Sequence, residues 1–159
     1  DDVVRVPLII KWPDVIEKDS ICDDFVSNCL DLGPTILDII GENFEKDIHG
    51  RSLYPLLKGK NIKNWRNEII STYNGQQFGL YNQRMLRTKE WKYIWNPTAV
   101  DELYNLKEDP EELNNLIHNE SREELIGKLK KRLYERLNED GDELVRLWMK
   151  NQLLKNKKL

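Results

Sequence analysis

Residues 84–106, RMLRTKEWKYIWNPTAVDELYNL, decide the fold, because short β-forming segments alternate in them with turn residues. Four such segments, aromatic or β-branched in composition, occur in succession at residues 68–73, 80–87, 92–95 and 102–106. The links between them contain turn chemistry: Asn74-Gly75, Thr88-Lys89-Glu90 and Asn96-Pro97. Four short strands with short links predict an antiparallel sheet.

A long amphipathic helix is predicted after this sheet. Ser121 and Glu124 have the spacing of a capping box, and apolar residues then recur every four positions: Leu125, Leu129, Leu133 and Leu137. This apolar stripe either covers one face of the sheet, which we favour, or binds a partner helix. The predicted fold class is therefore α+β: a short, about four-stranded antiparallel sheet packed by a long amphipathic C-terminal helix.

The first 60 residues have a different character. Residues 3–12 are almost continuously apolar and β-branched, which is typical of a strand buried on both faces inside a parallel sheet. Residues 31–41 predict a short helix with Asp31 at its cap, Pro34 in its first turn and Gly41 at its end. A chain that opens in a buried strand is expected to be a piece of a larger protein.

Composition excludes several classes of protein. The 159 residues carry 25 Lys and Arg against 28 Asp and Glu, a formal net charge of −3. Without a basic block, nucleic acid is not an expected partner. No apolar run approaches the roughly 20 residues of a membrane span, so no membrane partner is expected either. The cellular compartment is left open.

A self-contained active site is not evident. Cys22 and Cys29 do not make a zinc site with His49 and His118, and we expect both cysteines to be buried. A Ser/His pairing of His49 with Ser52 has no triad spacing to support it. Adjacent acidic pairs are expected to lie on the solvated surface. We therefore assign no catalytic residue and no metal ligand to this chain.

The segment 73–87, YNGQQFGLYNQRMLR, is the most suggestive polar group. It concentrates amides, phenols and two arginines around glycines. Amides and a guanidinium suit a hydroxylated or anionic ligand, because arginine offers a planar fork of donors to an oxyanion. Alternatively, the segment is a polar turn in which Arg84 and Arg87 form structural ion pairs. The sequence leaves both interpretations open.

Five ordered blocks resemble the C-terminal part of the type I sulfatases, members of the alkaline-phosphatase-like superfamily. The strongest is residues 102–116, ELYNLKEDPEELNNL, which is similar to that family's ELYDL..DP.E..NL signature with Asn105 in place of Asp. The others are RVPLIIKWP at 5–13, DLGPTILD at 31–38, GRSLYPLL at 50–57 and RMLRTKEWKYIWN at 84–96.

The resemblance implies a division of the chain and a missing half. Residues 1–60 would be the C-terminal edge of the large α/β domain, a strand and helix remnant, and residues 61–159 the C-terminal subdomain. The family hydrolyses sulfate esters with a formylglycine, made within a C/S-x-P-x-R motif, and a divalent cation, usually Ca²⁺. Neither cysteine here fits that motif, so no cofactor is expected in this chain. Formylglycine and Ca²⁺ are implied only for the parent enzyme, whose N-terminal catalytic domain is the expected partner.

The resemblance also implies a role for the polar hairpin. In this family the C-terminal domain often borders the substrate pocket, so Asn74, Gln76, Gln77 and Arg84 are the candidates for a substrate-binding rim. The predicted function is the C-terminal portion of a sulfuric ester hydrolase, from a bacterium by composition, acting on a sulfate ester and inactive as this chain alone. The alternatives are a phosphodiesterase or phosphonate hydrolase of the same superfamily, or a non-catalytic interaction module.

Overall fold

A computed structural model describes residues 4–75, 82–145 and 147–155; of Leu147 and Trp148, only the helical backbone is described. The chain divides into two compact units, Asp1–Asn67 and Glu68–Leu159. The first unit contains helix α1 (Asn28–Ile40) and the one-turn helix α2 (Tyr54–Leu57). The second contains strands β1 (Glu68–Tyr73), β2 (Gln83–Thr88), β3 (Trp91–Trp95) and β4 (Glu102–Asn105), the 3-10 turn η1 (Glu120–Arg122), and helices α3 (Glu123–Glu139) and α4 (Leu147–Lys155).

The second unit confirms the predicted fold class. Its four strands form one sheet in the order β1-β2-β3-β4, and each neighbouring pair is antiparallel. The register places Ile70 beside Leu86, Leu86 beside Tyr93, and Tyr93 beside Leu103. Because side chains alternate between the faces of a strand, this cross-strand row lies on one face of the sheet.

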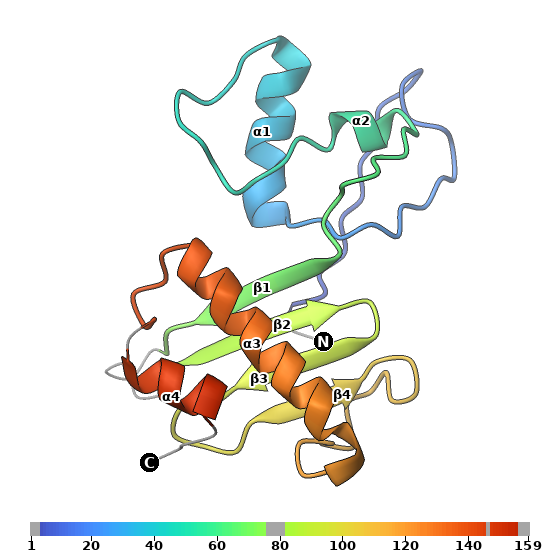
Figure 1. The fold of residues 1–159 in the computed structure, drawn as a ribbon. Helices are drawn as coiled ribbons and strands as arrows, with labels where there is room; N and C mark the ends of the chain where they lie inside the picture. Colours follow the sequence, from blue (N-terminus) through green and yellow to red (C-terminus); the bar gives the residue numbers. More distant parts are fainter. Residues whose placement is uncertain (1–3, 76–81, 146, 156–159) are drawn as a thin grey trace. The chain divides into compact units, whose positions relative to one another are not determined.

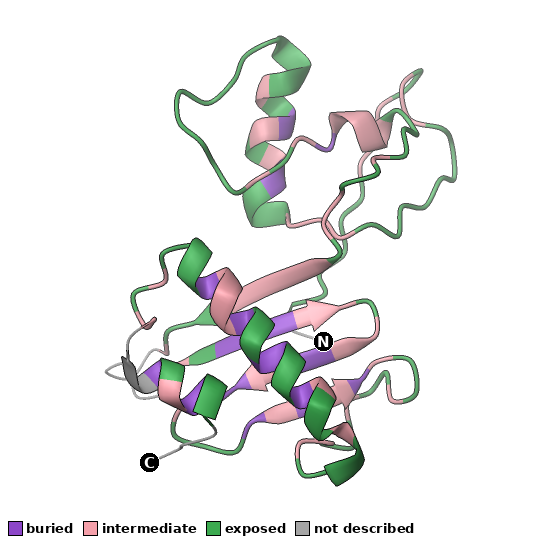
Figure 2. Cartoon of the chain, viewed as in Figure 1, coloured by how far each residue is buried: buried purple, intermediate pink, exposed green. Residues whose placement is uncertain are grey.

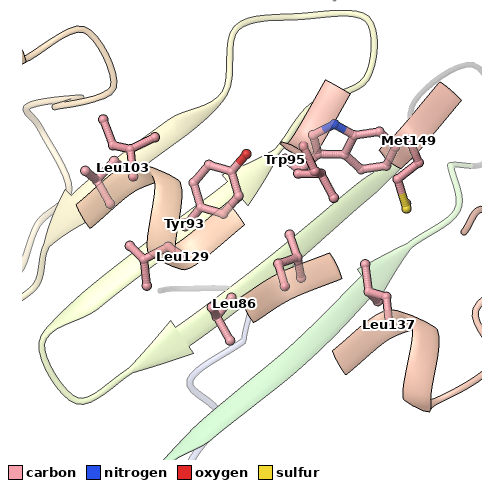
Figure 3. Close-up of a cluster of buried hydrophobic side chains, with 10 residues drawn as sticks. Leu86, Tyr93, Trp95, Leu103, Leu129, Leu137 and Met149 are labelled. Carbon is pink, nitrogen blue, oxygen red and sulfur yellow. The ribbon is translucent and has the colours of Figure 1, made fainter. Parts of the chain in front are cut away.

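Helix α3 lies across that face (Figure 1). Its buried apolar residues are Ile126, Leu129, Leu133 and Leu137, and they form the core together with the strand residues Leu86, Tyr93, Trp95 and Leu103 (Figure 3). Buried and exposed residues alternate along the helix in Figure 2, as an amphipathic helix on a sheet requires. The leucine stripe therefore covers the sheet, and the partner-helix interpretation was wrong.

The predicted capping box does not form. Asn119 accepts the Ser121 N–H with its side chain and begins the 3-10 turn, and α3 follows from Glu123 without a side-chain cap. The side chain of Asn119 therefore supplies the hydrogen-bond acceptor that the capping box was expected to supply.

The first unit differs more from expectation. Residues 4–12 form no strand, and Ile9 is 90% exposed. A strand buried on both faces takes its hydrogen bonds and its cover from neighbouring elements, and the described residues supply none for it. Helix α1 begins three residues before Asp31, so Pro34 lies inside the helix rather than in its first turn. Gly41 ends the helix at φ 80°, as predicted.

Within the described ranges, no helix combines the length and the apolar content that crossing a bilayer requires.

Candidate functional site

The predicted rim lies where β1 leaves the sheet and β2 returns to it. Tyr73 ends β1 with half of its surface exposed, and the exposed Asn74 follows it. Gln83 begins β2 opposite Tyr73 in the register. The candidates Gln76 and Gln77 lie outside the described residues. Asn74 thus presents its amide to solvent at the end of the sheet.

Arg84 is placed differently from Asn74, because it is only 2% exposed. Its Nε and Nη2 donate to the two carboxylate oxygens of Asp142, at 2.8 and 3.2 Å, in a bidentate ion pair. Its Nη1 donates to the main-chain carbonyls of Tyr73 and Gln83, at 3.2 and 2.8 Å. The structural ion pair that the sequence left open is therefore present, and the guanidinium holds both strand ends of the hairpin.

The partner of Arg84 comes from the turn after α3. Gly141 adopts φ 70°, and the Asp142 N–H donates to the Leu137 carbonyl, which closes the end of the helix. The Asp142 carboxylate also accepts the Leu144 N–H at 2.8 Å. Sequence reasoning missed Asp142. The Asp-Gly-Asp run at the end of the predicted helix marks the turn, but only the fold brings it to β2.

Helix α4 contacts the same end of the sheet. The indole N–H of Trp95 donates to Gln152 Oε1 at 3.0 Å, and both side chains are buried. Met149 and Leu153 of α4 belong to the same core cluster as Trp95, and Met149 lies beside Trp95 in Figure 3. Trp95 is the register partner of Arg84 on β3. Two cross-strand neighbours are thus bonded to the segment that follows α3.

A buried polar network lies further along the sheet. Tyr93 donates its hydroxyl to Asp101 Oδ2 at 2.9 Å, the Asn96 N–H donates to Asp101 Oδ1, and Lys130 Nζ lies 3.7 Å from the same carboxylate. Burial, and then the charge of Asp101, raise the pKa of Tyr93 well above its usual range. Its phenol therefore stays neutral and donates, which fits a structural role.

Tyr104, on the opposite face of the sheet by strand alternation, donates to Glu102 at 2.8 Å. Partial burial and this neighbouring carboxylate raise the pKa of Tyr104 to about 12. On β3, Lys92 pairs with Glu112 at 2.7 Å. These groups pair with one another, and none of them is arranged as an acid and base around an open site.

In the first unit, polar residues on one face of α1 bind the chain that follows Gly50. Asp31 accepts the Arg51 N–H at 2.9 Å, Thr35 Oγ1 accepts the Leu53 N–H at 2.8 Å, and Asp38 accepts the Ser52 hydroxyl at 2.5 Å. Ser52 is thus bonded to Asp38. His49, with which a catalytic pairing was considered, is exposed. An open cavity of about 380 Å³ lies beside this contact, and Ser52 is one of the residues that line it. The Ser52 hydroxyl also accepts the Tyr54 N–H.

Asp31 is fully buried and binds four donors. Its carboxylate receives two bonds from the Arg66 guanidinium, at 2.5 and 2.7 Å, besides the N–H groups of Arg51 and Ser27. Asp31, which was predicted at the cap of the helix, thus lies inside α1 and accepts the N–H of Ser27, the residue that precedes the helix. The prediction that both cysteines are buried was wrong, because Cys22 and Cys29 are exposed free thiols. Cys22 lies beside the Asp24 carboxylate, and Cys29 is in the first, solvent-facing turn of α1.

Metal-ligating side chains do not gather into a cluster in the parts of the chain that the structure describes. No group of three or more His, Cys, Asp or Glu side chains is arranged there to hold a metal ion. The second unit is a small domain in which one antiparallel sheet is covered by helices.

A known protein family matches most of this chain. Residues 1–139 match the family model described as N-sulphoglucosamine sulphohydrolase, C-terminal, and the chain belongs to this family. An ulvan-active sulfatase of Formosa agariphila is 27% identical over 87% of this chain and 34% of its own length. An N-acetylglucosamine-6-O-sulfatase of Bacteroides thetaiotaomicron is 33% identical over 73% of this chain and 22% of its own length. The chain spans about a third or less of these relatives.

Solved structures agree with the fold. A protein solved in complex with its substrate, D-glucosamine-2-N,6-O-disulfate, superposes with a TM-score of 0.63 and 28% identity, over 72% of this chain and 24% of that one. The phosphonate monoester hydrolase of Agrobacterium radiobacter superposes with a TM-score of 0.59 over 68% of this chain and 24% of that one, at 23% identity. The second likeness shows a shared fold alone.

Proposed function

We propose that this chain is the C-terminal portion of a sulfuric ester hydrolase, in which it supplies scaffold and part of the rim of the substrate pocket. One observation carries the proposal: the family match covers residues 1–139, while the chain spans only a third of a sulfatase relative. The rest of such an enzyme would hold the reacting groups.

The first unit fits the edge of a larger α/β domain. Helix α1 exposes Ile36 and Ile40 by 60% and 65%, and Ile9 is more exposed still. Apolar surface of this kind is usually buried against another element. We assign residues 1–60 to the C-terminal edge of the α/β domain and residues 61–159 to the C-terminal subdomain, so that these isoleucines would pack against the N-terminal catalytic domain.

The cofactors belong to that domain in this proposal. A formylglycine and Ca²⁺ would supply the nucleophile and the charge neutralisation of the sulfate group in a bacterial parent enzyme. We assign neither group to a residue of this chain.

For the rim, we retain Asn74, Gln76, Gln77 and Arg84 as candidates. Asn74 is exposed and has free access to a ligand, whereas Arg84 acts by holding the strand ends on either side of the hairpin. Amide side chains suit the hydroxyl groups and sulfate oxygens of a sugar. The substrate class we favour is therefore a sulfated sugar, as the names of two related proteins also suggest.

The proposal is tested by comparing the 159-residue chain with the protein encoded by its complete reading frame. We expect the longer protein to hydrolyse an aryl sulfate and a 6-O-sulfated N-acetylglucosamine, and the chain alone to hydrolyse neither. Turnover by the chain alone would contradict the proposal, as would a complete reading frame without a C/S-x-P-x-R motif. Faster hydrolysis of a phenyl phosphonate than of any sulfate ester would favour the phosphonate hydrolase alternative.

A further inference from the structure

The segment after α3, residues 140–155, lies beyond the part of the chain that the family model matches. It contributes Asp142 to the ion pair with Arg84 and Gln152 to the hydrogen bond with Trp95. Met149 and Leu153 anchor it in the core, at 0% and 3% exposure. The segment is thus an integral part of the second unit.

The contacts of Asp142 with Arg84 and of Gln152 Oε1 with Trp95 fall on one cross-strand pair. Arg84 of β2 and Trp95 of β3 are register partners, so the segment binds two adjacent strands at the same level of the sheet. This level adjoins the β1–β2 connection, because Arg84 also donates to the carbonyl of Tyr73, the last residue of β1. Asn74 comes next in the chain.

A continuous series of bonds therefore runs from the C-terminal segment to the predicted rim. Asp142 fixes the guanidinium, the guanidinium fixes the Tyr73 carbonyl, and Tyr73 places Asn74. The Arg84–Asp142 pair is desolvated, with side-chain exposures of 3% and 11%. In such surroundings a bidentate pair is strong and directional, and removal of one partner leaves the other charge buried.

We propose that Asp142 is a positioning residue for substrate recognition: acting through Arg84, it holds the end of β1 and so orients Asn74 toward the substrate. The inference rests on the proposed function, and it assigns part of substrate selection to a segment outside the family match. A substitution in this segment would then change how the rim is positioned and leave the reacting groups unchanged.

The first experiment uses the 159-residue chain and does not depend on activity. Backbone hydrogen exchange is measured for Asp142→Asn, with Glu90→Gln as the matched control. Glu90 forms an ion pair with Lys107 at 3.2 Å, but that pair is exposed and lies at the β2–β3 turn. We expect Asp142→Asn to raise the exchange rates of Tyr73, Asn74 and Gln83 about tenfold relative to those of β4, and Glu90→Gln to leave them unchanged.

Two results of this experiment would overturn the proposal. Unchanged exchange at Tyr73 and Gln83 would show that Asp142 does not hold the strand ends. An equal rise in β4 would show a general loss of stability rather than local positioning. If Asp142→Asn does not fold, Arg84→Lys, which keeps the charge but not the bidentate fork, is measured in the same way and judged by the same two results.

The second experiment uses the protein encoded by the complete reading frame. We expect Asp142→Asn to raise KM for a 6-O-sulfated N-acetylglucosamine about tenfold with less than a twofold change in kcat, and Asp142→Glu to restore most of the loss. Asn74→Ala should raise KM similarly, and the double variant should be no worse than either single one. A KM unchanged in Asp142→Asn, or effects that multiply, would overturn the positioning role. Absence of any sulfate ester turnover in the unmodified protein would instead refute the proposed function, whatever the exchange rates show.

Discussion

Thr35→Val tests the contact by which α1 holds the chain after Gly50. Thr35 is 4% exposed, and its hydroxyl accepts the N–H of Leu53, which is itself 2% exposed. Valine has nearly the same shape but no acceptor, so the Leu53 N–H would be left buried and unpaired. Such a group typically destabilises a protein by about 1–3 kcal/mol.

The effect is measured by native-state hydrogen exchange at the Leu53 amide. A loss of about 1–3 kcal/mol corresponds to roughly 5–150-fold faster exchange where local opening limits the rate. Thr35→Ser is the matched control, because it keeps the Oγ atom and loses only a methyl group, and its Leu53 amide should stay protected. If Thr35→Val leaves the Leu53 exchange rate unchanged, or if Thr35→Ser raises it as much, the hydrogen bond does not hold this segment.

Three further predictions concern packing and titration. Gly50→Ala should destabilise the first unit by about 1–3 kcal/mol in thermal unfolding, because the added Cβ would overlap the main-chain carbonyl of Leu30; Gly127→Ala, with open space around its Cβ in α3, should instead stabilise the chain by up to about 1 kcal/mol. Leu133→Ala should lower the free energy of unfolding of the second unit by about 2–5 kcal/mol in a urea titration, since Leu133 is fully buried between α3 and the sheet; a loss below 1 kcal/mol would contradict this packing. Because the folded state raises the pKa of Tyr93, the contribution of this residue to the free energy of unfolding is complete below about pH 10. Above that pH only the unfolded chain ionises, so the contribution declines by up to about 1.4 kcal/mol per pH unit. Tyr93→Phe should therefore make the urea midpoint fall less steeply with rising pH, and an unchanged dependence on pH would count against a buried neutral phenol.

The parts of the fold that local chemistry determines could be predicted from the sequence. The four strands follow from β-forming residues between turn signals, and the leucine repeat placed α3 on the sheet correctly. Gly41 ends α1 because a left-handed position favours a residue without a side chain. In each case, the information lies within the element itself and the residues next to it.

The parts that depend on distant partners could not be predicted. The strand expected at residues 3–12 does not form in the described part of that range, residues 4–12, because hydrophobicity alone does not create the neighbours that a buried strand needs. The Arg84–Asp142 pair joins residues 58 positions apart, and nothing in the local sequence of either indicates the other. For the candidate site, the sequence therefore left open whether Arg84 binds a ligand or forms an ion pair, and it indicated neither the burial of Arg84 nor its partner.

The contacts also explain what the family-like blocks of this sequence encode. Asp31, Thr35 and Asp38 of the DLGPTILD block lie on one face of α1 and bind residues 51–53 of the GRSLYPLL block. The blocks RMLRT and KYIWN likewise pair as β2 and β3. In this chain, these motif residues hold backbone segments together, which is a structural role. A phosphonate monoester hydrolase shares the fold alone, at 23% identity. In the proposed enzyme, substrate choice would then depend on the rim candidates and on the contacts that position them, and Asp142 would act on them from outside the blocks through its ion pair with Arg84.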